Sequence, residues 1–398
     1  MTLSPRERVI RQIKHQETDI LPYTIRFGSD IGEQIEGYGT DVAERLDVHY
    51  GGPAWRKWID NAIVRVLTPE LSVDTAKGPI FTDVFGSRWR VDRRPFYLVE
   101  PVLKAPSLKG FSFPDVQTLL DDAWERRTLK AIEEAGDHFV VAGFAFGLWE
   151  RTWTLRGFED ALADAAGEPA FFEELLDCIA EHQMAIIERL VRLPVDGVMF
   201  SDDWGYQRGL LLGPERWRSL LKPRLARMYA RVHSAGKYTL SHCCGSVADV
   251  LPDIIEAGLD VLESVQPEAE KMDPYELKRS FGDRITFWGG IGSQSLIPLG
   301  TPDEIRAEIA KLCREMGRGG GYILAPAKPF QRRRIVDPAQ ATPEHLSNAA
   351  QHRQLTLAGG HDFAPTEDES GCGVGRSHAL LLGQPASGRK LCLTGRFP

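Results

Sequence analysis

Residues 195–245 read VDGVMFSDDWGYQRGLLLGPERWRSLLKPRLARMYARVHSAGKYTLSHCCG, and this stretch decides the fold. The apolar run at 195–200 predicts a buried strand, the segment from Gly213 to about Ala235 an amphipathic helix, and Tyr238–Ser241 a second strand. Two strands joined by a helix of this length pair in parallel, because the helix carries the chain back to the start of the sheet. The stretch therefore predicts one strand–helix–strand unit of a parallel sheet.

The same alternation continues in both directions along the chain. Further strands are predicted at 20–27, 138–146, 260–265, 285–288 and 322–324. Further helices are predicted at 31–38, 115–135, 168–193, 246–257, 273–281 and 301–316. About eight such units favour a closed (β/α)₈ TIM barrel of the α/β class over an open doubly wound sheet. No glycine-rich phosphate-binding pattern follows the first strand, which weighs against dinucleotide binding.

Two segments lie outside this alternation. Before it, Ser4, Pro5 and Glu7 form a helix-start signature, and residues 80–89 and 96–99 resemble a hairpin, so we expect an N-terminal helical and hairpin extension. After about Phe330 the periodicity stops. We therefore expect the barrel to occupy residues 1–335 and an irregular tail to occupy 336–398, either as a flexible segment or as a stretch outside the native reading frame.

Composition excludes several classes of protein. The 398 residues carry a formal net charge of −8, which argues against a nucleic-acid-binding surface. No apolar run of about 18 residues is present, and the N-terminal residues lack a secretory signal, so we expect a cytoplasmic protein that does not span a membrane. The six cysteines are too sparse for a disulfide framework, so clustered cysteines point to metal binding or catalysis.

The strongest candidate site follows the strand at 238–241. In a barrel of this kind, functional residues lie where strands end, and here the strand continues into His242, Cys243 and Cys244. An imidazole and a thiolate two residues apart suit zinc, and Cys243 between them would point away. The other interpretation of this cluster is a buried thiol pair beside a histidine that is bonded to backbone.

Carboxylates follow two neighbouring strands. Glu263 lies near the end of the strand at 260–265, where it could complete the metal's ligands, hold the His242 ring or pair with a basic residue. Asp202 and Asp203 end the strand at 195–200, and at most one of them can face the barrel mouth because adjacent residues on a strand point in opposite directions. The other interpretation of this pair is capping of the next helix.

Three further positions are candidates. Glu150 follows the strand at 138–146, and we expect it, with the two aspartates, to act in catalysis. Arg26 lies within the first strand, where a guanidinium could bind a carboxylate or phosphate or form a structural ion pair. Gly290, in Gly289-Gly290-Ile291-Gly292, could let a ligand approach the backbone or could only form a tight loop.

Several of these residues belong to motifs that together resemble the uroporphyrinogen decarboxylase superfamily, over roughly residues 3–331. The motifs are Asp83-Val84-Phe85-Gly86 before Trp89, Ser201-Asp202-Asp203-Trp204-Gly205, Pro223-Arg224, His233-Ser234-Ala235-Gly236-Lys237, His242-Cys243-Cys244-Gly245 and Gly289-Gly290-Ile291. The resemblance implies a (β/α)₈ barrel. It also implies one of two activities, that of the haem-pathway decarboxylase or that of the zinc-dependent methyltransferases that demethylate a methyl-corrinoid protein.

The chain departs from the pattern of both branches. Arg26 resembles the first arginine of the decarboxylases' substrate-carboxylate motif, whose second arginine is missing here. His242 and Cys244 match the methyltransferases' zinc pair. The decarboxylases' late histidine and the methyltransferases' last zinc cysteine both fall at Lys328, so zinc would need another ligand, for which Glu263 is the candidate. The resemblance makes substrate-binding candidates of Arg26, Trp204, Gly290 and Lys328.

The favoured hypothesis is therefore a methyltransferase that moves a methyl group from a methyl-corrinoid protein to a small-molecule acceptor, either a thiol or tetrahydrofolate. Zinc would be its cofactor, and the corrinoid would be carried by a separate partner protein. The alternatives are decarboxylation of a tetrapyrrole, as in porphyrin biosynthesis, and non-enzymatic binding of a corrinoid or tetrapyrrole. The oligomeric state stays open.

Overall fold

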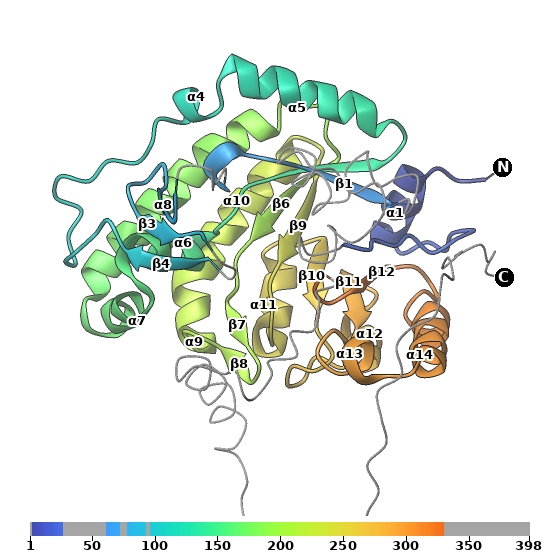
Figure 1. Cartoon of the computed structure of the whole chain (residues 1–398). Helices are drawn as coiled ribbons and strands as arrows, with labels where there is room; N and C mark the ends of the chain where they lie inside the picture. The colour runs from blue at the N-terminus through green and yellow to red at the C-terminus, as the bar shows by residue number, and fades with distance from the viewer. Residues whose placement is uncertain (1, 27–60, 72–77, 93–95, 330–398) are drawn as a thin grey trace, which may run out of the picture. The chain divides into compact units, whose positions relative to one another are not determined.

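A curled sheet of parallel strands forms the centre of the molecule (Figure 1). The computed structural model describes residues 2–26, 61–71, 78–92 and 96–329, which all lie in one unit, Met1–Arg333. Among these residues the sheet holds seven strands, paired in chain order: β1 (Ile63–Leu67), β5 (Phe139–Gly143), β6 (Gly197–Ser201), β9 (Tyr238–His242), β10 (Val261–Val265), β11 (Thr286–Ile291) and β12 (Tyr322–Pro326). The predicted (β/α)₈-barrel class is confirmed.

A short extended segment joins the two edge strands of this sheet. Tyr23 forms a parallel bridge with Leu324 of β12, and the Thr24 amide donates to the Leu324 carbonyl at 2.9 Å. On the other side, the Ala62 amide, directly before β1, donates to the Tyr23 carbonyl at 3.0 Å. The segment therefore occupies the eighth position of the barrel. The predicted strand at 20–27 is reduced to this bridge in its described part, up to Arg26.

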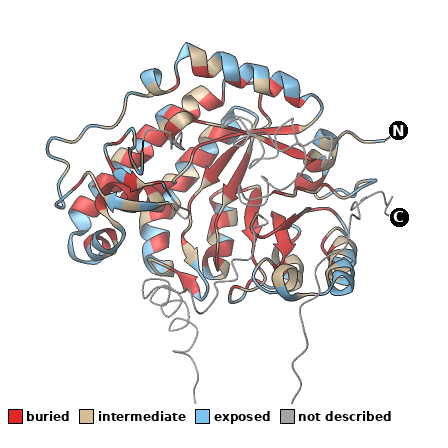
Figure 2. Cartoon of the chain, viewed as in Figure 1, coloured by how far each residue is buried: buried red, intermediate tan, exposed pale blue. Residues whose placement is uncertain are grey.

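Helices connect the strands and cover the outside of the sheet (Figure 1). The connections contain α4 (Val116–Leu119) and α5 (Asp122–Ala135) before β5; α6 (Leu148–Arg156), α7 (Phe158–Gly167) and α8 (Pro169–Leu190) before β6; α9 (Pro214–Arg216), a π-helical turn (Trp217–Leu221) and α10 (Lys222–Ser234) before β9; α11 (Leu251–Glu256) before β10; α12 (Pro274–Phe281) before β11; and α13 (Leu296–Leu299) and α14 (Pro302–Glu315) before β12. Their outer faces are exposed and their inner faces are buried (Figure 2).

The barrel interior is packed with large apolar side chains. Alternate residues of the strands, among them Phe139, Met199 and Leu240, form one buried cluster. Helix α1 (Pro5–Ile13) adds Val9 and Ile13 to the same cluster, so it closes the end of the barrel where the strands begin. The interior is therefore a solid core, and the open end lies where the strands finish.

The N-terminal extension contains a three-stranded antiparallel sheet of β2 (Ile80–Thr82), β3 (Arg88–Arg90) and β4 (Tyr97–Glu100). Asp83 organises its first turn, since the carboxylate accepts the amides of Phe85 and Ser87, both at 2.9 Å, and the Trp89 indole at 2.8 Å. Gly86 completes the turn with φ +94, a conformation that favours glycine. The Asp83–Trp89 motif therefore has a structural role.

Several local predictions can be compared with this structure. The predicted helix-start signature at Ser4 and Glu7 is a capping box, and a second capping box joins Thr301 with Glu304. The sequence pattern does not predict β1, and it does not predict α6 and α7, which begin at glycines that provide no side-chain cap. The predicted helix at 31–38 and the predicted tail at 336–398 lie outside the described residues. Within the described part of the chain, helices are too short or too polar for a membrane span.

Candidate metal centre

The register of the sheet places polar side chains in the last layer of the barrel interior. Along β9, Leu240 faces the apolar core, and the alternation of the strand turns His242 to the same side at the open end. His242 is paired with Glu263 of β10, which is paired in turn with Trp288 of β11. The strands therefore bring these three residues into one layer, in which Trp288 still belongs to the apolar core.

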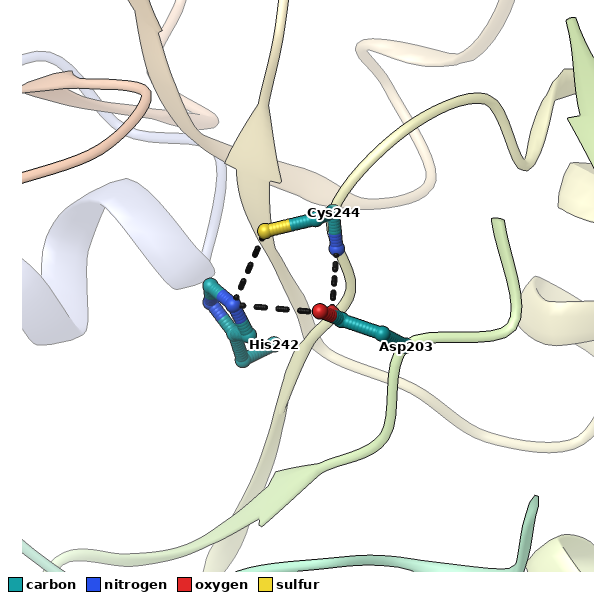
Figure 3. A group of neighbouring side chains, drawn as sticks. All are labelled: Asp203, His242 and Cys244. Carbon is teal, nitrogen blue, oxygen red and sulfur yellow. Dashed lines mark hydrogen bonds and ion pairs between the residues drawn. The ribbon is translucent and has the colours of Figure 1, made fainter. Parts of the chain in front are cut away.

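Cys244 and Asp203 approach the Nε2 atom of His242 from the loops after β9 and β6 (Figure 3). The Cys244 Sγ lies 3.3 Å from this nitrogen, and the nearer Asp203 oxygen lies 3.7 Å from it. The same oxygen accepts the Cys244 amide at 2.7 Å. The ligand atoms of the three residues all lie within 4.8 Å of one another. The predicted pair His242 and Cys244 is thus joined by Asp203.

Glu263 lies on the opposite side of the imidazole ring. Its Oε2 is 3.3 Å from the His242 Nδ1 atom, and it also accepts a hydrogen bond from Arg65 at 2.5 Å. Its other oxygen pairs with Arg26. Of the three roles predicted for Glu263, the geometry therefore matches orientation of the ring and pairing with arginine. It does not match coordination of a metal at Nε2.

The charges in this layer shift the ionisation of its members. Burial acts to raise the pKa of Glu263, but Arg26 and Arg65 outweigh burial and hold this pKa well below its usual range. This carboxylate is therefore ionised. Burial lowers the pKa of His242, but Cys244 and Glu263 outweigh it and raise that pKa well above its usual value. Arg65 also lies over the Trp288 ring, 4.8 Å from its centroid, which fixes the guanidinium against an aromatic face.

Asp202 points away from the cluster toward α6. Its carboxylate accepts the amides of Trp149 at 3.0 Å and Glu150 at 2.7 Å, so it caps a helix whose N-cap residue, Gly147, has no side chain to do so. It also accepts the Trp204 indole at 2.6 Å. Burial raises the pKa of Asp202 to about 7, while the three donors act in the opposite direction. Of the two adjacent aspartates, only Asp203 faces the cluster.

Glu150, in the first turn of α6, lies near Asp203 and Asp202. Burial, followed by the negative charges of these two aspartates, raises the pKa of Glu150 well above its usual range. Its carboxyl group therefore binds a proton more readily than an ordinary glutamate does. The Glu150 amide donates to Asp202, which directly follows β6. The position of Glu150 is therefore fixed by this loop residue as well as by its own helix.

Cys243 faces the opposite way from its neighbours, as its position between them predicts. It is 1% exposed, and its sulfur accepts the Trp204 amide at 3.3 Å. Burial raises the pKa of the Cys243 thiol well above its usual value. Cys243 therefore joins the loops after β6 and β9 and keeps its proton.

Three predicted substrate-binding residues lie outside the cluster. Trp204 is buried, and its ring packs edge-on against Trp217 with centroids 5.3 Å apart. At Gly290, a Cβ would lie 2.8 Å from the hydroxyl of Tyr322, so close packing accounts for this glycine. Lys328 is partly exposed just after β12, and it forms no hydrogen bond or ion pair with the described residues. Arg26, the fourth, lies in the cluster but is paired with Glu263.

Arg65 is the member of this layer that the sequence does not predict. It lies within β1, in the run Ile63-Val64-Arg65-Val66-Leu67. An arginine inside an apolar strand is the same signal that identifies Arg26, and it could have identified Arg65 if the strand had been recognised.

The donor set suits a divalent metal such as zinc. Imidazole, thiolate and carboxylate are all zinc ligands, and catalytic zinc sites have three protein ligands with a fourth position open. In addition, a carboxylate that accepts the other N–H of a ligating histidine is the usual outer partner in such sites. Glu263 fits that partner position behind His242.

Comparison with known proteins bears on the fold and the family. The family model described as Uroporphyrinogen decarboxylase (URO-D) matches residues 110–329. A solved structure of a methyltransferase from Methanosarcina mazei superposes with a TM-score of 0.63 at 20% identity, covering 89% of this chain and 99% of that one. At 20% identity, the similarity to the Methanosarcina mazei structure concerns the fold alone.

Two curated relatives carry different names. The Methylcobamide:CoM methyltransferase MtaA of Methanosarcina barkeri is 32% identical over 155 residues, which cover 39% of this chain and 42% of that relative. The uroporphyrinogen decarboxylase of Methylococcus capsulatus is 24% identical over 274 residues, 67% of this chain and 71% of the relative. Since the family model spans more than half of the sequence, the chain belongs to the uroporphyrinogen decarboxylase family.

Proposed function

We propose that this chain is a methyltransferase that moves a methyl group from a methyl-corrinoid, carried by a separate protein, to a thiol acceptor. The observation that carries the proposal is the convergence of the Cys244 sulfur and the His242 Nε2 atom, 3.3 Å apart, at the open end of the barrel. The similarity to a methylcobamide:CoM methyltransferase supports it. Tetrahydrofolate is the other acceptor class, for which the carboxylates would be more important than a metal.

The chain's own residues would prepare the thiol. When bound at His242 and Cys244, a zinc ion would supply Lewis acidity that lowers the pKa of an acceptor thiol. Glu263 fixes the His242 ring by accepting from Nδ1, so that the Nε2 atom would bind the ion in place of a proton. The raised pKa of Glu150 favours its protonated form, in which the carboxyl group would orient the acceptor by donating a hydrogen bond.

The transfer itself requires no redox partner. The acceptor thiol loses its proton to solvent, and the resulting thiolate attacks the methyl carbon of the corrinoid. The carbon–sulfur bond forms as the cobalt–carbon bond breaks, and the electron pair of the broken bond stays on cobalt. The products are a methyl thioether and a corrinoid reduced by two electrons.

A spectroscopic assay tests this proposal. Purified protein is incubated under anaerobic conditions with methylcob(III)alamin and coenzyme M, and loss of the methylated corrinoid is followed by absorbance. We expect turnover by the wild type and its loss in His242→Ala and Cys244→Ala. Cys178→Ala, on the outer helix α8, serves as the matched control with normal turnover. Equal rates in the wild type and Cys244→Ala would contradict the proposal, and replacing the thiol with tetrahydrofolate tests the other acceptor.

Decarboxylation of a tetrapyrrole is the second candidate, because the decarboxylase relative aligns over 67% of this chain. Such a substrate presents several carboxylates that need cationic partners. Arg26, the arginine suggested for that role, instead pairs with the buried Glu263. Anaerobic incubation with uroporphyrinogen, followed by chromatography of the oxidised products, would reveal less carboxylated porphyrins if this candidate were correct.

A further inference from the structure

Asp203 lies where a third metal ligand is needed. Two ligands of a tetrahedral zinc ion, with bonds of about 2.0–2.3 Å, lie about 3.3–3.6 Å apart. The observed distances from His242 Nε2, 3.3 Å to the Cys244 sulfur and 3.7 Å to the Asp203 oxygen, are close to that spacing without any ligand having to move far. We propose that Asp203, His242 and Cys244 are the three protein ligands of a zinc-type divalent ion, with Glu263 as an outer partner. This assignment rests on the site of the proposed function.

The arginines explain why Glu263 is not the third ligand. Both of its oxygens are already bound, one by Arg26 and the other by Arg65 and the His242 Nδ1 atom. The two nitrogens of an imidazole point in different directions, so an ion at Nε2 has Glu263 behind the ring. To reach the ion, Glu263 would have to break its ion pairs with two buried guanidinium groups, which is strongly unfavourable.

Charge balance leads to the same assignment. The positive charges of Arg26 and Arg65 already balance the negative charge of Glu263, so this carboxylate does not contribute negative charge to a metal site. A Cys244 thiolate and an Asp203 carboxylate together carry two negative charges, which match a divalent cation beside a neutral imidazole. With these ligands in place, the fourth position remains open for the sulfur of the acceptor.

The opening of the barrel provides access for an ion. The side chains of Asp203 and His242 are 39% and 24% exposed, whereas that of Glu263 is 1% exposed. The purely structural interpretation is that Asp203 only holds the loop after β9 by accepting the Cys244 amide at 2.7 Å. Asparagine at position 203 can still accept that amide, but it is a poor ligand. The two interpretations therefore predict different behaviour for Asp203→Asn.

The test measures metal binding and does not depend on activity. Metal-free wild type, Asp203→Asn, Glu263→Gln and the control Asp273→Asn are titrated with Zn²⁺ against a chromophoric chelator. Asp273 is the matched control because it also accepts a backbone amide, that of Glu276 at 2.8 Å, but as the N-cap of α12. Co²⁺ replaces Zn²⁺ in a second titration, whose visible bands report the ligands of the ion.

We expect one zinc ion per wild-type chain and an unchanged affinity in Asp273→Asn. Glu263→Gln should weaken binding by about 10–100-fold, as loss of an outer partner does, with the Co²⁺ bands retained. Asp203→Asn should weaken it more than Glu263→Gln does and should alter those bands. Circular dichroism confirms that each variant folds, and Asp203→Ser replaces Asp203→Asn if that variant fails to fold.

The assignment would be overturned if Asp203→Asn bound zinc as tightly as the wild type does, or if Glu263→Gln weakened zinc binding more than Asp203→Asn does. Neither result would contradict the proposed methyl transfer. A wild-type chain that binds no zinc would overturn the assignment as well. Conversely, Asp203-dependent zinc binding without methyl transfer from methylcob(III)alamin would support the assignment and contradict only the proposed function.

Discussion

Replacing Asp202 with alanine should destabilise the fold strongly, although the residue is only one position from Asp203, a proposed metal ligand. The carboxylate is 1% exposed and accepts three N–H donors, from Trp149, Glu150 and the Trp204 indole. Each buried donor left without a partner costs about 1–3 kcal/mol. One water molecule in the vacated space can satisfy at most part of this set, so we expect a loss of about 3–5 kcal/mol in the free energy of unfolding.

Urea denaturation followed by far-ultraviolet circular dichroism measures this loss. Asp202→Asn keeps one acceptor oxygen and should lose about half as much, while Trp204→Phe removes a single donor and should cost about 1 kcal/mol through that bond. The effects of Asp202→Ala and Trp204→Phe should not add, because both remove the same hydrogen bond. An Asp202→Ala variant within about 1 kcal/mol of the wild type would refute this account of the α6 cap.

Three further changes test other parts of the structure. Gly147→Ala places a Cβ 2.5 Å from the Asp202 Cβ and should cost about 1–3 kcal/mol in urea denaturation; an unchanged midpoint would show that this contact is not tight. Arg65→Met leaves Glu263 with one guanidinium fewer and should cost about 3–5 kcal/mol by the same measurement, whereas a neutral effect would mean that the pair contributes little. Burial lowers the pKa of His15, so the unfolded chain binds the proton more tightly than the folded chain does. The free energy of unfolding should therefore rise as the pH increases toward 6.5. His15→Asn should reduce this rise between about pH 5 and 7, and an identical pH profile in the variant would exclude His15 as its source.

The alternation of strands and helices could be predicted because each element has a local signature. β6, β9 and β10 are apolar runs, and the capping residues of α1 and α14 are visible in the sequence. Strand β1 could not be predicted because Arg65 interrupts an apolar run that is only five residues long. Helix α6 could not be predicted because the side chain that caps it belongs to Asp202, which is 52 positions away from Glu150 in the sequence.

The cluster could be predicted in part for similar reasons. His242 and Cys244 are close in sequence, so their spacing suffices to bring them together. Which of Asp202 and Asp203 faces the opening depends on the path of the loop after β6, and no local pattern determines that path. The role of Glu263 depends on arginines from β1 and from the segment beside β12, which are about 200 residues away or more.

The bridge between Tyr23 and Leu324 has a consequence for how the molecule forms during translation. Residues 22–25 lie between β12 and β1, so these early residues have only one of their two neighbours until residue 326 has left the ribosome. Ring closure is therefore a late event that joins sites about 300 positions apart, and contacts of such long range slow folding. Until then the nascent barrel exposes unpaired strand edges, which we expect chaperones to shield.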